Sequence, residues 1–328
     1  MATKIKKAKP EQAYLKVAVY GPSGSGKTFS SLLWAEGLAK KEGKKILLVD
    51  TERGADFYGM KIPARKVHPE AFSFDVLHTM SMKETLDELL ELDTSEYGVV
   101  VVDSITHLWE AIQNAVPDED RAKNGSIPLH LWAGIKKPYK NLLRFLLDCE
   151  MHVFVLGREK NVFEEEDGQL KQVGKTMRAE GETPYEFHIC IRQESRKAKN
   201  NSASSTILSI IEKDRTGILA TQTIPNPTYK TIEPVVSILN GTQAKTPSVD
   251  EVAEIDQELL DRNSKDKVAK SEEKYKEFSD SISKAKSPQE LNAVGDKIGK
   301  SRVLVEGDKK LLRGLYEKKL NKLNELVK

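Results

Sequence analysis

The chain has 328 residues, enough for one large α/β domain of roughly 200 to 250 residues and a smaller module. Its 52 Lys and Arg residues nearly balance 50 Asp and Glu residues, so no global field indicates a nucleic-acid or acidic-membrane partner. The two cysteines, Cys149 and Cys190, lack the spacing of a zinc site, which favours buried thiols in a reducing compartment. The longest apolar runs are strand-sized and no apolar leader follows the N-terminal lysines, which predicts a cytoplasmic protein with no membrane contact.

The first half of the chain alternates apolar strands with amphipathic helices. Continuous apolar runs predict strands at 13–20, 45–49, 74–77, 99–102 and 151–156. Helices are expected between them, one with Leu32, Ala35 and Leu38 on one face and one opening at the capping sequence 81–84. Runs of this kind are typical of strands buried on both faces, so the fold class is α/β, with a mostly parallel sheet covered by helices on both sides.

The second half changes character twice. Closely spaced strands at 187–192, 206–211, 218–224 and 228–232 predict an antiparallel extension at one sheet edge. Residues 241–268 lose periodicity and predict a linker between a P-loop domain over 1–240 and a helical module over 269–328. Three amphipathic helices are expected in that module, with Phe278, Leu291 and Leu312 on their respective apolar faces.

A complete phosphate-binding loop follows the first strand. It comprises Gly21, Pro22, Ser23, Gly24, Ser25, Gly26, Lys27 and Thr28, and Phe29 follows it at the start of the helix. Its glycines permit close backbone approach, Lys27 reaches the β- and γ-phosphates, and the Thr28 hydroxyl is the expected magnesium ligand. The sequence therefore predicts a site for ATP and Mg²⁺ at residues 21–29, with Lys27 also contributing to catalysis.

Two acids follow strands that should end beside this loop. Asp103 ends the run of valines at 99–102 and is the candidate second magnesium ligand, although an aspartate there could instead cap the following helix. Glu52 follows the second strand, and because parallel strand ends gather at one sheet edge, it is the candidate base that activates water. A solvated loop carboxylate is the alternative for Glu52.

These motifs resemble the RecA-like ATPase core, and within it phage single-strand annealing and recombination proteins. The resemblance rests on 21–28, on Leu48 to Glu52 and on Val100 to Ser104, and extends loosely to about residue 240. It implies that Glu52 polarises the attacking water and that Asp103 holds magnesium. The first strand begins near residue 13, so filament assembly through a preceding segment is not expected. Arg158 stands where the recombinases have a glutamine that senses the γ-phosphate.

The resemblance also implies an assembly with nucleotide at the subunit interfaces. Lys213 and Arg215 lie where the RecA class carries cations that reach a neighbouring subunit's nucleotide; a charged hairpin turn is the alternative. We therefore expect a homo-oligomer, working in the host bacterial cytoplasm if the protein is phage-encoded.

Single-stranded DNA is the expected partner, and two segments could bind it. The 160–185 segment is predicted to be a glycine-spaced loop, with Lys171, Lys175 and Arg178 as contacts and a run of acids at 164–167 opposing them. The helix after Pro128 offers Lys136, Lys137 and Lys140 instead. Histidines 107, 152 and 188 have no ligand spacing and are interpreted as structural.

The sequence thus favours an ATP-hydrolysing, phage-type DNA recombination protein. Three alternatives need the same phosphate loop. One is a RecA-fold helicase or helicase loader, and another is a small-molecule kinase. The third is a nucleotide-controlled scaffold whose C-terminal helices recruit a partner, such as a single-strand binding protein or another recombination protein.

Overall fold

The computed structural model describes the chain except residues 1–13, 66, 167, 198–204, 240–267 and 326–328. It divides into two compact units, residues 1–244 and 245–328. The predicted linker lies almost wholly outside the described residues. No helix in the described part of the chain is long and apolar enough to cross a membrane.

A nine-stranded sheet forms the centre of the first unit, in the order β3-β2-β4-β5-β1-β7-β8-β9, with β6 paired to β5. Its parallel strands are β1 (Lys16–Gly21), β2 (Lys45–Asp50), β3 (Asp75–His78), β4 (Tyr97–Asp103), β5 (His152–Glu166) and β7 (Ile189–Lys197). Strand β1 lies between β5 and β7, and β4 lies between β2 and β5. The carboxyl ends of β1, β2, β4 and β5 therefore share one edge, where the phosphate loop follows β1.

Three strands run antiparallel to their neighbours: β6 (Gln169–Met177), β8 (Ser205–Asp214) and β9 (Thr223–Pro225). The antiparallel extension is confirmed: β7 pairs antiparallel with β8, although it pairs in parallel with β1 on its other side. Two strand predictions in this region were wrong. In the segment predicted as a strand at 218–224, only the last two residues are in a strand, β9. The segment predicted as a strand at 228–232 begins helix α6 (Tyr229–Ile238), because the side chains of Thr228 and Thr231 close a capping box at its N-terminus.

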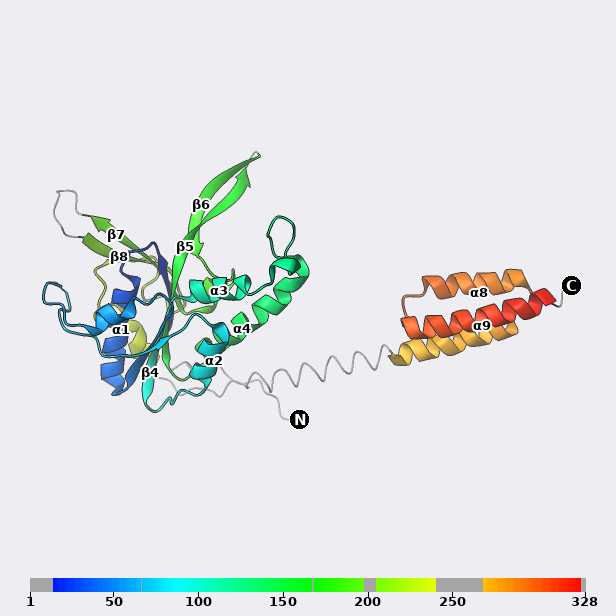
Figure 1. The fold of residues 1–328 in the computed structure, drawn as a ribbon, viewed down its shortest axis with the longest axis horizontal. Helices are drawn as coiled ribbons and strands as arrows, with labels where there is room; N and C mark the ends of the chain where they lie inside the picture. The colour runs from blue at the N-terminus through cyan, green and yellow to red at the C-terminus, as the bar shows by residue number, and fades with distance from the viewer. Residues whose placement is uncertain (1–13, 66, 167, 198–204, 240–267, 326–328) are drawn as a thin grey trace. The chain divides into compact units, whose positions relative to one another are not determined.

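Helices cover both faces of the sheet, as predicted (Figure 1). Helices α1 (Lys27–Glu42) and α6 pack against the face that carries Val17 and Val19 of β1. The opposite face carries Ala18 and Tyr20 and is covered by α2 (Met82–Leu90), α3 (Ile105–Asn114) and α4 (Trp132–Asp148). Short elements complete the unit: η1 (Ala55–Gly59), η2 (Asp118–Asp120), η3 (Leu129–Leu131) and α5 (Thr183–Glu186).

The second unit is a helical module. It contains a helix that includes residues 268–284, followed by α8 (Pro288–Lys300) and α9 (Glu306–Glu325). The Ser287 side chain caps α8 by accepting a hydrogen bond from the backbone N–H of Glu290. The predicted apolar faces meet in one core, which includes Phe278, Leu291 and Leu312.

Candidate nucleotide-binding site

The glycine loop joins β1 to α1 in a conformation that side chains would obstruct. Gly26 has a φ of 90°, and a Cβ added there would lie 2.4 Å from Ile207 Cδ1. A Cβ on Gly21 would lie 2.2 Å from the carbonyl oxygen of Gln193. Helix α1 starts at Lys27 with no acidic residue in its first turn, so its partial positive charge is available to an anion. The Ser25 hydroxyl is buried in this loop without a hydrogen-bond partner among the described residues.

Lys27 lies against the loop that precedes it. Its ammonium donates hydrogen bonds to the carbonyl oxygens of Gly21, at 3.1 Å, and Pro22, at 3.0 Å. Burial lowers the pKa of Lys27, while the nearby carboxylates of Asp103 and Glu52 oppose that shift. The two acids predicted for the site are thus close enough to Lys27 to act on it electrostatically.

Thr28 and Asp103 meet as expected for two ligands of one metal ion. The Thr28 hydroxyl donates to Asp103 Oδ2 at 2.6 Å, across 75 positions of sequence. Burial raises the pKa of Asp103 to about 6; the Thr28 hydrogen bond and Lys27 oppose the shift, whereas Glu52 and Asp50 add to it. Hydroxyl and carboxylate oxygens are the donors that Mg²⁺ accepts, with waters and phosphate oxygens completing its shell. The residues present therefore fit a magnesium site, and Asp103 does not use its side chain to cap α3.

Glu52 follows β2 on the same edge of the sheet. Its backbone N–H donates to Asp50 Oδ1 at 2.9 Å, which fixes the turn after β2. The oxygen Oε1 has contacts from two other elements: Arg158 Nη2 of β5 at 3.1 Å and His107 Nε2 of α3 at 3.7 Å. Arg158, a possible sensor of the γ-phosphate, therefore contacts the predicted base Glu52.

His107 and Thr51 were not predicted to belong to this site. His107 Nδ1 lies 2.9 Å from the Thr51 hydroxyl, and the opposite ring nitrogen faces Glu52. His107 lies in the first turn of α3, and that helix begins two residues after Asp103, the last residue of β4. The sequence carries that spacing, but only the adjacency of β2 and β4 brings Thr51 and Glu52 to it.

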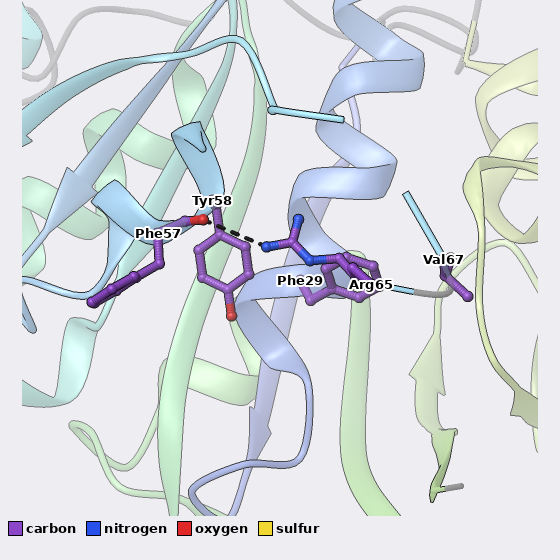
Figure 2. Close-up of a pocket in the computed structure, with 5 residues that line it drawn as sticks. All are labelled: Phe29, Phe57, Tyr58, Arg65 and Val67. Atoms are coloured by element: carbon purple, nitrogen blue, oxygen red, sulfur yellow. Dashed lines mark hydrogen bonds between the residues drawn. The ribbon is translucent and has the colours of Figure 1, made fainter. Parts of the chain in front are cut away.

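An aromatic pocket adjoins the start of α1 (Figure 2). Its volume is about 400 Å³, and it is lined by Phe29, Phe57, Tyr58, Arg65 and Val67. The Arg65 guanidinium lies 5.6 Å from the ring centroids of both Phe29 and Tyr58. Burial, and after it the Asp103 carboxylate, raises the pKa of Tyr58, so Tyr58 lies near the proposed metal ligand.

The segment predicted as a DNA-binding loop is mostly a β-hairpin. Strands β5 and β6 pair from Glu159–Met177 outward to Glu166–Gln169 and extend beyond the rest of the unit (Figure 1). The loop prediction for 160–185 was therefore wrong over most of its length, because β5 continues to Glu166 and β6 returns antiparallel to it. All three predicted DNA contacts are in ion pairs: Lys171 with Glu166, Lys175 with Glu159 and Arg178 with Glu110.

The remaining predicted residues lie away from the glycine loop. Lys213 and Arg215 both donate to the carbonyl oxygen of Tyr185, and their neighbour Asp214 pairs with Ile189. Ile189 in turn pairs with Val17, near the start of β1, whereas the glycine loop follows its end. Within one chain these two cations therefore lie toward the opposite end of the sheet from the loop.

The family of this chain follows from comparison with protein-family models. The model described as the AAA domain matches residues 13–229. The chain belongs to the AAA-domain family. The match spans the P-loop, Glu52, Asp103 and the β5–β6 hairpin, so the AAA domain of this P-loop ATPase family contains the whole candidate site. No curated protein matches the chain.

Proposed function

We propose that this AAA-domain protein binds ATP with Mg²⁺ and hydrolyses it, as a phage-type DNA recombination ATPase acting on single-stranded DNA in the bacterial cytoplasm. The observation that carries the ATPase activity is the hydrogen bond of 2.6 Å between Thr28 and Asp103, beside Lys27 and Glu52. Thr28 and Asp103 would hold the magnesium ion, which neutralises charge on the phosphate oxygens.

In the proposed reaction, Glu52 accepts a proton from the attacking water. The water oxygen bonds to the γ-phosphorus while the bond to the β,γ-bridging oxygen breaks, giving ADP and phosphate. Lys27 and the N-terminus of α1 stabilise the negative charge on the phosphates. Glu52 is suited to the role because its carboxylate is part exposed, with 38% of the side chain accessible, while its turn is fixed by Asp50.

The aromatic pocket is proposed to hold the nucleobase. Phe29 directly follows Thr28, so the pocket adjoins the glycine loop and one nucleotide could place its base in the pocket and its phosphates on the loop. A volume of about 400 Å³ is within the range of small-molecule sites, and flat rings with an arginine favour a planar ligand. Arg65→Ala should weaken ATP binding but leave tripolyphosphate binding unchanged; equal losses for both ligands would contradict the assignment.

Glu52→Gln tests the catalytic proposal directly. The amide keeps the shape of the side chain but loses its basicity, so ATP should still bind while turnover falls by about 100-fold or more. Binding is measured with a fluorescent ATP analogue and turnover by phosphate release. Unchanged turnover would show that another residue activates water.

For single-stranded DNA, the exposed face of α4 is a stronger candidate than the hairpin. Lys137, Lys140 and Arg144 are spaced three and four residues apart, so they share a helix face, and within the described part of the chain they form no ion pair. Lys136 is paired with Glu180 at 2.8 Å. The three hairpin cations are also paired, although exposed pairs of this kind contribute at most about 1 kcal/mol and can be exchanged for phosphate.

Two multiple variants separate these surfaces. Replacing Lys137, Lys140 and Arg144 by alanine should weaken DNA binding and reduce its salt slope by about 0.7 for each lost phosphate contact. The triple alanine variant of Lys171, Lys175 and Arg178 should have a smaller effect, and exposed Lys40→Ala is the control. If only the hairpin variant loses DNA, the hairpin is the site; if neither does, the DNA proposal fails.

We propose a homo-oligomer in which Lys213 and Arg215 act on a neighbour's nucleotide. Their distance from their own glycine loop supports a role between subunits and not within one. Lys27→Ala mixed with Arg215→Ala should then regain some turnover at mixed interfaces. Turnover that is independent of protein concentration in a proven monomer would contradict the assembly.

The C-terminal module is proposed to recruit a single-strand binding protein or another recombination partner. Its separate core supports an independent unit. A helicase would instead unwind duplex DNA processively in a strand-displacement assay, and this outcome distinguishes it from the proposed recombination protein.

A further inference from the structure

The carboxylate of Glu52 has a second, organised partner in His107. The Glu52 oxygen Oε1 lies 3.7 Å from His107 Nε2, and the other ring nitrogen, Nδ1, lies 2.9 Å from the Thr51 hydroxyl. The imidazole is mostly buried, with 15% of its side chain exposed, and Thr51 is buried. A ring held this way has one side fixed by the protein and the other directed at the carboxylate.

The Glu52 carboxylate favours one tautomer of this ring. The Thr51 hydroxyl oxygen accepts from the backbone N–H of Ser104 at 2.8 Å and keeps a second lone pair. It can therefore donate to His107 Nδ1 at 2.9 Å, or accept from it while donating to the Asp103 carbonyl at 3.2 Å. The Glu52 oxygen on the other side of the ring favours the first arrangement, which has the ring proton on Nε2. The reverse tautomer would set a nitrogen lone pair against a carboxylate oxygen.

We propose that His107 is a positioning residue that aims Glu52 at the water, with Thr51 holding the imidazole ring in place. This inference rests on the proposed role of Glu52 as the base. The separation of 3.7 Å is longer than a hydrogen bond, and contacts of this kind often shorten when a substrate binds. Arg158, at 3.1 Å from the same oxygen, is the charged group on the β5 side; Lys27 acts from the glycine loop.

The chain of contacts also links the base to the metal ligand. Ser104, whose N–H starts the chain, directly follows Asp103, and its hydroxyl lies 3.5 Å from the same Glu52 oxygen. Thr51 directly precedes Glu52. Contacts thus run without a gap from the residue after the metal ligand to the proposed base, through Ser104, Thr51 and His107.

Two substitutions at one position separate positioning from packing. In His107→Gln the amide nitrogen takes the approximate place of Nε2 and can still donate to Glu52. In His107→Asn the amide takes the approximate place of Nδ1, which preserves the Thr51 contact but leaves Glu52 without this donor. We expect His107→Asn to lower kcat by about 10- to 100-fold with little change in KM for ATP, and His107→Gln to retain most of the turnover.

The same variants in a Glu52→Gln background complete the test. His107→Asn should then cost nothing further, because its effect passes through Glu52. Equal kcat values for the Asn and Gln variants, or a further loss of turnover in the Glu52→Gln background, would overturn the positioning role. Wild-type turnover by Glu52→Gln itself would overturn the proposed base, and with it this inference, whereas wild-type kcat in His107→Asn beside an inactive Glu52→Gln overturns only the role of His107. Retained ATP binding by each variant shows that it is folded.

Discussion

Asp103→Asn should stabilise the nucleotide-free protein while removing its response to magnesium. The pKa of Asp103 is raised from its ordinary 3.8 to about 6, chiefly by burial. That difference means that burying the ionised carboxylate lowers the free energy of unfolding by about 3 kcal/mol. Asparagine keeps an acceptor for the Thr28 hydroxyl but never ionises. The free energy of unfolding should therefore rise by about 3 kcal/mol at pH 8.

The sign of the pH dependence follows from the two pKa values. Below pH 3.8 the carboxyl is protonated in both the folded and the unfolded protein, so burial of the charge no longer lowers the free energy of unfolding. Between 3.8 and about 6 only the unfolded chain is ionised, and the cost grows with pH; above about 6 it is constant. The advantage of the variant should thus shrink to about 1 kcal/mol near pH 4.5.

Urea titration with EDTA, followed by tryptophan fluorescence, measures this difference. The three tryptophans, Trp34, Trp109 and Trp132, all lie in the first unit, so the signal reports that unit alone. The exposed Glu88→Gln is the control for loss of a carboxylate. Adding Mg²⁺ to ATP should stabilise the wild type further but not Asp103→Asn. A variant less stable than wild type at pH 8, or a difference independent of pH, would refute the reasoning.

Three further predictions concern other parts of the chain. The pKa of buried His188 is lowered to about 4, so the free energy of unfolding decreases as the pH falls from about 6.5 toward 4. In urea titrations, the wild type should lose about 2 kcal/mol more of this free energy between pH 7 and pH 5 than His188→Asn does. Gly26→Ala should weaken ATP binding in a fluorescence titration, through strain and contact with Ile207, whereas Gly43→Ala, at a φ of 68° in open space, should be equally strained but bind normally. Deleting residues 245–328 should leave ATP affinity unchanged; an unfolded product would contradict the unit boundary.

Much of the fold was predictable because its signals are local. Strands β1, β2 and β4 and the first half of β5 contain continuous apolar runs, and the glycine loop and Asp103 are marked by neighbouring residues in the sequence. Ser81 could likewise be predicted as a helix cap, and its side chain accepts from the backbone N–H of Glu84. The family match confirms a P-loop ATPase domain, and the sheet confirms the α/β fold class.

The errors arose where local signals conflict or where contacts are distant. Thr228 to Ile232 contains β-branched residues and precedes Pro234, yet the segment is helical because its capping box and its packing against α1 outweigh β-propensity. The outer part of β5 is mostly exposed and ends in three consecutive glutamates, so neither an apolar run nor an alternation of apolar and polar residues marks it as a strand. The link from Thr51 to His107 depends on β2 lying beside β4, and no local pattern reports strand order.

Phosphate release from ATP by the full-length protein tests the central claim most directly. The wild type should release phosphate with Mg²⁺ and not with EDTA, because Thr28 and Asp103 form a magnesium site and not a structural pair alone. Lys27→Ala, which removes the cation from the glycine loop, should lose ATP binding or turnover. Magnesium-independent hydrolysis, or a Lys27→Ala protein that turns over ATP like the wild type, would contradict the assignment of this site.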